Sequence, residues 1–284
     1  MIFQSLKYNK ATDYAKIIHY VCKNKYNYGE NEKWYKFDDN RWIEIRSKNY
    51  LLRNTITDML RKHYEDVLEY YKKNNYDDKK ITKITNIIDL FGDTNMKNNI
   101  MVELTELYSI NNEGKFIEKL DSNQNLIGFD NGIYDLNKWE FRKGNPCDYV
   151  SMSVGYNYSE KYTNKIENIK QFFKDIMPNN EEREYLLTLI GSFLIGTNFD
   201  EIYSIFTGGM RNGKSTLTNI LMYTLGDYYG DIQNTMLTKE RPSSAVAQPD
   251  LMELIKKRLV ISSENEANQK INTGFIKSIT GNDR

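Results

Sequence analysis

Apolar residues in the first part of the chain switch between a helical and a strand-like spacing. Between residues 12 and 23 they recur every three or four positions, which predicts a short amphipathic helix. Residues 34–37 and 41–46 instead alternate apolar and polar side chains across the polar turn 38–40, a pattern typical of a β-hairpin. Helical spacing then predicts three further helices, at 51–73, 80–91 and 97–108.

A second hairpin and a pair of helices are predicted in the middle of the chain. The apolar runs 126–130 and 133–136 flank Asn131-Gly132, which favours a tight turn because both residues tolerate a positive φ. A polar linker then leads into two stretches of helical spacing, at 166–176 and 181–195.

The pattern changes again in the last part of the chain. Apolar residues predict a strand at 202–207, followed by a glycine-rich loop, a helix running to Leu225 and a second strand at 259–262. A strand, a glycine loop and a helix in this order are typical of an α/β nucleotide-binding layer. We therefore expect an α/β fold in this region, preceded by a mixed α+β, mostly helical region with β-hairpins.

Composition narrows the classes of protein to which the chain can belong. The 284 residues correspond to about two domains, and 39% apolar residues supply enough core to fold. Basic and acidic residues number 39 each, so any nucleic-acid contact must be a local patch. Two cysteines and two histidines exclude a disulfide scaffold and a zinc ribbon, which favours an intracellular location. No segment is typical of a secretory leader or a membrane span.

Residues 208–216 carry the most specific motif in the sequence, because they fit G-x-x-x-x-G-K-[ST] between a predicted strand and a predicted helix. Gly208 and Gly213 allow backbone conformations that turn N–H groups inward around phosphates, next to the positive end of the helix dipole. Lys214 can reach the β- and γ-phosphates, and the Ser215 hydroxyl can bind Mg²⁺. The predicted nucleotide contacts are Gly208, Gly209, Met210, Arg211, Asn212, Gly213, Lys214, Ser215 and Thr216.

Two glutamates near the end of the chain are the candidate catalytic acids. A hydrolase of this class needs an acidic residue at the end of a neighbouring strand, to hold Mg²⁺ and to polarise the attacking water. Glu264 follows the predicted strand 259–262 and would emerge at the same edge as the phosphate loop, as a catalytic residue and metal ligand. Glu266 lies two positions further on. The alternative is that either glutamate merely solvates a loop.

Three stretches, in this order and spacing, carry a family resemblance. They are 131–136 with 189–196, then 208–228, and finally 250–284. The part of the chain from about Leu120 onward resembles the primase-helicases of large DNA viruses, phages and plasmids, of the poxvirus type, whose motor is a superfamily 3 helicase of the AAA+ type. Residues 1–119 match more loosely, mainly through the hairpin 34–42 and its flanking helices.

The resemblance implies an ATP-dependent DNA helicase segment of a viral or mobile-element replication protein. Its cofactors would be ATP and Mg²⁺, and its substrate single-stranded or forked DNA. The fold would be an incomplete AAA+-type P-loop core with a helical collar at 161–284, after an α+β domain at 1–160. Such motors form rings, usually hexamers, and work with other replication proteins, away from any membrane, in the host cytoplasm or at a viral replication site.

The resemblance also assigns roles to individual residues. It makes Lys214 and Ser215 the contacts of ATP and Mg²⁺, Glu264 the Walker B acid, and Lys277 and Arg284 candidate DNA contacts.

The sequence departs from the family pattern in two ways. The chain stops at Arg284, before the family's sensor residue and arginine finger, so we expect it to be a C-terminally truncated motor. Residues 1–119 lack the acidic metal-binding pattern of a primase site, so we expect no primer synthesis by this chain.

Three basic stretches are candidate DNA contacts: 41–48 beside the aromatic residues of the first hairpin, 239–241 and 256–258. The aromatic residues Trp34, Tyr35 and Trp42 could equally form the hairpin core, and 256–258 could be merely solvated. Two other classes of protein also carry a phosphate loop, and both remain alternatives. They are a nucleoside or nucleotide kinase and a non-catalytic ATP-binding adaptor.

Overall fold

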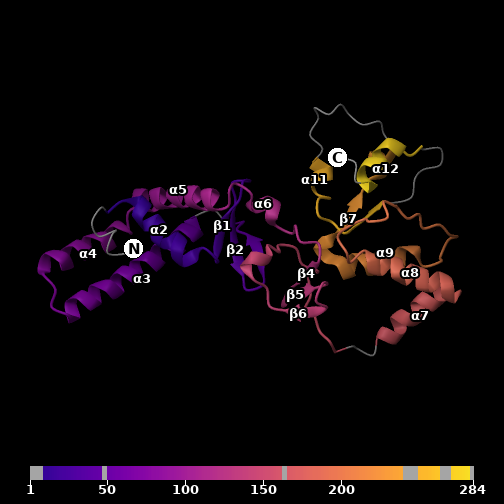
Figure 1. Ribbon diagram of the computed structural model, residues 1–284, viewed down its shortest axis with the longest axis horizontal. Helices are drawn as coiled ribbons and strands as arrows, with labels where there is room; N and C mark the ends of the chain where they lie inside the picture. Colours follow the sequence, from indigo (N-terminus) through magenta and orange to yellow (C-terminus); the bar gives the residue numbers. More distant parts are fainter. Residues whose placement is uncertain (1–8, 47–49, 162–164, 239–248, 263–269, 282–284) are drawn as a thin grey trace. The chain divides into compact units, whose positions relative to one another are not determined.

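The computed structural model describes residues 9–46, 50–161, 165–238, 249–262 and 270–281 (Figure 1). The chain separates into two units, Met1–Leu120 and Asp121–Arg284. Helices predominate and the strands form small sheets, so the mixed α/β character predicted from the sequence is confirmed. Among the described helices, none is both long enough and apolar enough to span a bilayer.

The first unit is a three-stranded antiparallel sheet flanked by helices. Its elements are α2 (Ala11–Cys22), β1 (Tyr26–Tyr28), β2 (Trp34–Asp38), β3 (Arg41–Glu44), α3 (Tyr50–Lys73), α4 (Asp78–Leu90), α5 (Thr94–Asn111) and α6 (Phe116–Lys119). Asp38 pairs with Arg41 across the β2–β3 turn, and Asp39 takes a positive φ there. The hairpin and the four helices predicted before residue 110 are confirmed.

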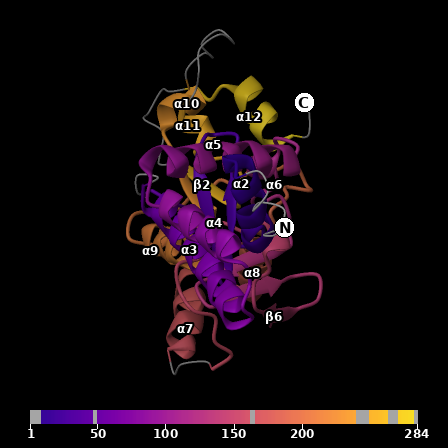
Figure 2. The same ribbon diagram turned by 90° about the vertical axis from the view of Figure 1, so that its left-hand side faces the viewer.

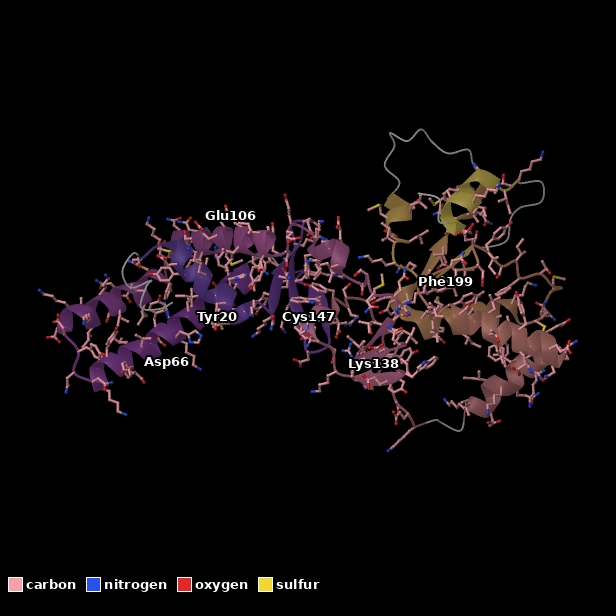
Figure 3. The ribbon with its side chains drawn as sticks, in the orientation of Figure 1. Tyr20, Asp66, Glu106, Lys138, Cys147 and Phe199 are labelled. Carbon is pink, nitrogen blue, oxygen red and sulfur yellow. The ribbon has the colours of Figure 1, made fainter. Side chains whose placement is uncertain are left out.

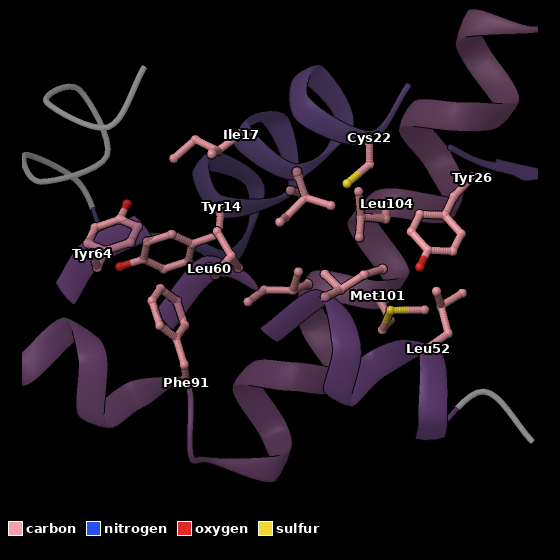
Figure 4. Close-up of a cluster of buried hydrophobic side chains, with 14 of the residues drawn as sticks. Tyr14, Ile17, Cys22, Tyr26, Leu52, Leu60, Tyr64, Phe91, Met101 and Leu104 are labelled. Atoms are coloured by element: carbon pink, nitrogen blue, oxygen red, sulfur yellow. The ribbon is translucent and has the colours of Figure 1, made fainter. Parts of the chain in front are cut away.

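The core of the first unit lies between α2, α3, α4 and α5, and α3 and α4 run side by side (Figures 1 and 2). Tyr14 packs edge to face on Phe91 and on Tyr64, with ring centroids 4.9 and 5.8 Å apart (Figure 4). Asp77 and Asp93 cap the N-termini of α4 and α5 with their carboxylates, which satisfies backbone N–H groups that have no partner within the helix.

The aromatic residues of the first hairpin belong to the core. Trp34, Tyr35 and Trp42 are all buried, and the rings of Tyr35 and Trp42 pack edgewise on Phe116. Rings enclosed in this way cannot stack on bases, so the interpretation of these residues as hairpin core is confirmed and the stacking platform is wrong.

The second unit contains an antiparallel and a parallel sheet. Its elements are β4 (Leu126–Phe129), β5 (Gly132–Asp135), β6 (Glu140–Arg142), the 3₁₀ turn η1 (Pro146–Asp148), α7 (Ile166–Ile176), α8 (Asn180–Ser192), α9 (Lys214–Leu225), the 3₁₀ turn η2 (Gly226–Tyr228), β7 (Tyr229–Ile232), α10 (Asn234–Thr238), α11 (Pro249–Met252), β8 (Leu259–Ser262) and α12 (Thr273–Thr280). β7 and β8 are parallel, while β4, β5 and β6 are antiparallel. The predicted helices at α7, α8 and α9 and the predicted strand at β8 are confirmed.

Three features of this unit differ from the prediction. Phe129 pairs with Gly132, so the tight turn is Asp130-Asn131, one residue earlier than predicted. Five helices and strands of this unit were not predicted, namely β6, β7, α10, α11 and α12. The segment 202–207 is not a strand, and Ile202, Tyr203, Ile205 and Phe206 are exposed. Apolar spacing alone does not make a strand, which needs a neighbour for its backbone hydrogen bonds, and no described residue pairs with this segment.

The domain boundary predicted at residue 160 falls inside the second unit. The reason is a shared core, in which Ile127 of β4 and Val154 pack with Leu225 and Tyr228 at the end of α9. The β4–β6 sheet and α9 therefore fold on a common apolar cluster rather than on either side of a linker.

Candidate nucleotide-binding site

The phosphate loop, residues 208–213, leads directly into α9. The helix begins at Lys214, and Gly213 precedes it as an N-cap in the left-handed conformation. One face of the helix is apolar at a spacing of four residues, which anchors it in the unit. The buried residues of that face are Leu217, Leu221 and Leu225.

The side of the loop that would meet a ligand is open. Residues 208–212 are exposed, and so are Ser215 and Thr216 on the first turn of α9. Met210 is 98% exposed at the loop apex. The structure therefore brings the loop, the helix N-terminus and the Ser215 hydroxyl together with free access from solvent.

A side chain at either glycine of the motif, Gly208 or Gly213, would meet a neighbouring side chain. A Cβ atom on Gly208 would overlap the Asn212 side chain, and one on Gly213 would overlap Ile176 of α7. Gly213 also has a φ of 85°, in the left-handed region where other residues are strained. Arg211 has a positive φ of 59°, so the loop reverses direction within a few residues.

The ammonium group of Lys214 folds back over the loop. Its Nζ donates hydrogen bonds to the carbonyl oxygens of Gly208 at 2.6 Å and Gly209 at 3.0 Å, and to Asn212 Oδ1 at 3.0 Å. An ammonium group has three N–H donors, and these three acceptors use all of them. The positive charge is therefore held at the loop instead of extending into solvent.

The helices α7 and α8 pack against α9 and the phosphate loop. Phe173 and Leu186 share a buried cluster with Leu217 and Leu221 of α9, while Ile176 lies against Gly213. Sequence reasoning missed this role of Ile176, although its place at the end of the strongly amphipathic stretch 166–176 is a signal that could have suggested it.

The glutamates predicted to complete the nucleotide site follow β8. β7 and β8 pair in parallel from Tyr229–Leu259 to Ile232–Ser262, and the Ser262 hydroxyl donates to Asn234 Oδ1. Glu264 and Glu266 lie outside the described residues, so their catalytic and metal-binding roles stay predictions.

The two candidate DNA contacts near the end of the chain lie in or beyond α12. Lys277 is exposed on α12, next to the buried Phe275 and Ile276. Arg284 lies outside the described residues.

The residues that follow α9 attach it to the β4–β6 sheet. The Tyr228 hydroxyl accepts the Gly128 N–H at 2.9 Å and donates to the Met152 carbonyl at 3.3 Å. Burial raises the pKa of Tyr228 to about 12. Asp227 and Ser153 exchange two hydrogen bonds, both of 2.9 Å, one through the Asp227 N–H and one through its carboxylate.

Residues of the basic run 256–258 also bind to the β4–β6 sheet and to η2. The Arg258 guanidinium lies over the Tyr228 ring and donates to the carbonyl oxygens of Leu126 and Leu194. Lys257 Nζ donates to the Asp227 carbonyl at 2.7 Å. Two of the three basic groups are thus bound within the fold, so the run is neither a free DNA patch nor merely solvated. The candidate patch 239–241 lies outside the described residues.

Comparison with known proteins assigns the chain to a family. Residues 15–178 match the family described as D5 N terminal like. A "Putative helicase" of Acanthamoeba polyphaga mimivirus is 37% identical over 268 residues, which cover 89% of this chain and 27% of the relative. A "Putative helicase" of Invertebrate iridescent virus 6 is 28% identical over 292 residues, covering 88% and 30%.

A "Putative primase" of African swine fever virus is 23% identical over 270 residues, which cover 89% of this chain and 27% of that protein. This chain therefore spans less than a third of the length of each of these relatives. The match to the family extends over more than half of the chain and joins both of its units. The chain belongs to the D5 N terminal like family, and its resemblance to the primase-helicases of large DNA viruses is confirmed.

Proposed function

We propose that this chain is part of a DNA replication primase-helicase and contributes the ATP-binding portion of an AAA+-type, superfamily 3 helicase motor. The observation that carries the proposal is the Lys214 ammonium bound to three acceptors of an exposed glycine loop at the start of α9. A positive charge, a helix N-terminus and inward-turned backbone at one place suit a triphosphate. The names of the viral relatives support a role in replication.

The residues present fit ATP and Mg²⁺. Gly208 and Gly213 both take a positive φ that other residues rarely adopt, and without side chains their backbone can approach phosphates closely. Lys214 would bind the β- and γ-phosphates, and Ser215 would hold Mg²⁺. Glu264 would complete the metal site and orient water, with Glu266 as its neighbour. Bound ATP supplies the phosphoanhydride bond whose hydrolysis drives translocation.

The decisive experiment compares ATP binding and hydrolysis in three variants of the full chain. Lys214→Ala should lose ATP affinity by at least about tenfold because the loop loses its cation. Glu264→Gln should bind ATP normally and hydrolyse it poorly. Lys143→Ala, which removes an exposed lysine that follows β6, should behave as the wild type.

The same measurements separate the alternatives. If the protein is a helicase motor, single-stranded DNA should stimulate its hydrolysis of ATP. Phosphate transfer to a nucleotide instead of water would indicate a kinase, and wild-type function in Glu264→Gln would indicate an adaptor. ATP binding that survives in Lys214→Ala would refute the proposed site.

The proposal includes a ring assembly, because motors of this family complete each ATP site with an arginine from a neighbouring subunit. Light scattering with and without ATP and DNA tests it. A hexamer is expected of the motor once that arginine is present, and a monomer of such a protein under all conditions would contradict the ring.

A further inference from the structure

The end of α3 and its connection to α4 carry three tyrosines at one end of the first unit. The ring centroids of Tyr71 and Tyr76 are 4.3 Å apart, and Tyr70 lies 6.2 Å from each of them. Tyr71 is buried, whereas Tyr70 is 54% and Tyr76 is 37% exposed. The cluster therefore has an inner ring that holds the helices together and two outer rings that face solvent.

The backbone at this end is well defined by hydrogen bonds. The Tyr76 N–H donates to the Tyr71 carbonyl at 3.1 Å, and the Asn74 side chain donates to the Tyr70 carbonyl at 2.7 Å. Asn75 takes a positive φ of 53°, which asparagine tolerates better than most residues. The two outer rings are thus presented from an ordered turn.

Five lysines lie within seven residues of Tyr76 in the sequence, and none of them forms an ion pair with a described residue. They are Lys72, Lys73, Lys79, Lys80 and Lys83. Residues 72–80 are exposed throughout. Over residues 69–83 the five lysines outweigh three acidic residues, five minus three, giving a charge of plus two in a chain whose net charge is zero. Lys80 lies over the Tyr76 ring, with its Nζ 5.4 Å from the centroid.

Two of the acidic residues have a structural reason to be here. Asp77 is the N-cap of α4, and its carboxylate accepts the Lys79 N–H at 3.3 Å. Asp78 occupies the first turn, where a carboxylate complements the positive end of the helix dipole. Lys72 and Lys73 in the last turn of α3 likewise complement the negative end of its dipole, which leaves Lys79, Lys80 and Lys83 as the lysines without a helix-end role.

Packing alone accounts for Tyr71 but not for the outer rings. A ring that closes a helix pair is expected to be buried, as Tyr71 is, and the larger part of the Tyr70 ring faces water. Trp139, at the β5–β6 turn, provides a contrast. It is 76% exposed, yet the adjacent Lys138 (Figure 3) pairs with Glu140 at 3.7 Å, so no free positive charge accompanies the ring.

We propose that the α3–α4 end, defined by Tyr70, Tyr76 and the five lysines, binds single-stranded nucleic acid. Exposed aromatic rings stack on bases irrespective of sequence, and unpaired lysines neutralise phosphates. An acidic protein could also use the lysines and the rings, and the oligonucleotide titrations below distinguish the two kinds of partner. This site lies outside the phosphate loop, and its substrate rests on the proposed function of the whole protein in DNA replication.

The first test removes the charge. Full-length protein with Lys72, Lys73, Lys79 and Lys80 changed to Gln is titrated against a fluorescein-labelled oligodeoxythymidylate of about 20 nucleotides, without nucleotide. The slope of log affinity against log salt should fall by about 3, because four phosphate contacts are lost at roughly 0.7 each. A control with Lys16, Lys23, Lys115 and Lys143 changed to Gln carries the same charge change on other exposed positions and should bind as the wild type.

The second test separates stacking from charge. Tyr70→Leu combined with Tyr76→Leu should weaken oligonucleotide binding about tenfold, whereas Phe at both positions should bind as the wild type. Trp139→Ala should have no effect. Tyr71 is left unchanged because it is buried, and unfolding in urea checks that each variant is folded.

Unchanged oligonucleotide affinity in the lysine variant would overturn the proposal. So would equal loss in the lysine control, since binding would then depend on total charge. Loss in the lysine variant without loss in the Leu variant would point to a general polyanion surface and also contradict a stacking site. None of these measurements uses ATP, so they stand apart from the Lys214→Ala test. A failure of ATP binding and a failure of this surface are therefore distinguishable.

Discussion

The Arg258 guanidinium lies over the ring of Tyr228, with 4.6 Å between its Cζ atom and the ring centroid. Both residues also hydrogen-bond to the region around β4, Arg258 to the Leu126 carbonyl and Tyr228 to the Gly128 N–H. Arg258 immediately precedes β8, so this pair connects the strand that leads to the predicted catalytic acids with the antiparallel sheet. Burial lowers the pKa of the guanidinium, an expected consequence of its removal from water.

Arg258→Ala should destabilise the protein by about 2 kcal/mol, because the Leu126 and Leu194 carbonyl groups lose a charged donor and the Tyr228 ring loses its cation. Arg258→Lys should recover less than half of this, since one ammonium group lacks the planar fork that reaches both carbonyls. Urea unfolding followed by circular dichroism measures the change. Lys161→Ala, at an exposed position, should stay within about 0.5 kcal/mol of the wild type. An Arg258→Ala variant as stable as that control would contradict the role given to this residue.

Gly226→Ala should destabilise the protein by about 2 kcal/mol or more. Gly226 has a φ of 51°, and a Cβ atom there would overlap the Val154 backbone, which cannot move aside as a side chain would. Gly191→Ala is the matched control, because it places a Cβ in open space within α8 and should stabilise by about 0.5 kcal/mol. Thermal unfolding of the two variants distinguishes them, and equal midpoints would count against the steric argument.

Gly213→Ala should abolish ATP binding and destabilise the start of α9. The added Cβ combines an unfavourable φ of 85° with overlap on Ile176. A second change, Ile176→Ala, removes the overlap but not the backbone strain, so the double variant should regain part of the stability and little of the affinity. A fluorescent ATP analogue and urea unfolding report the two quantities. Gly209→Ala, where a Cβ meets nothing, should leave stability unchanged.

His19 should make the protein less stable in mild acid. Its ring packs on Tyr108 with 4.6 Å between centroids, and its Nε2 has no hydrogen-bond partner among the described residues. Burial, followed by the charge of Lys23, lowers the pKa of His19 below its ordinary value of about 6.5. The unfolded chain therefore binds more protons, and stability, complete above pH 6.5, falls as the pH drops through the lower folded value.

Urea unfolding midpoints measured between neutral pH and about pH 5 test this prediction. His19→Gln should flatten the pH dependence. An identical acid response in the wild type and His19→Gln would show that His19 does not cause it.

The helices of this protein were predictable because the information for them is local. The apolar face of α9 and the alternation in β2 and β3 are visible within a dozen residues, and so is the glycine spacing of the phosphate loop. The segment 202–207 has the same kind of apolar signal and still forms no strand, since a strand depends on a partner distant in sequence.

The amino-acid sequence by itself therefore determined the helices, the hairpins and the phosphate-loop motif, each of which depends on backbone and side-chain preferences over short stretches. Only the tertiary structure decided that Trp34 and Trp42 are core, that Gly226 must lack a side chain and that Arg258 is bound inside the fold. It also brought Tyr70 and Tyr76 together at an exposed end. Burial and steric contact arise between residues far apart along the chain, and no local pattern records which of them meet.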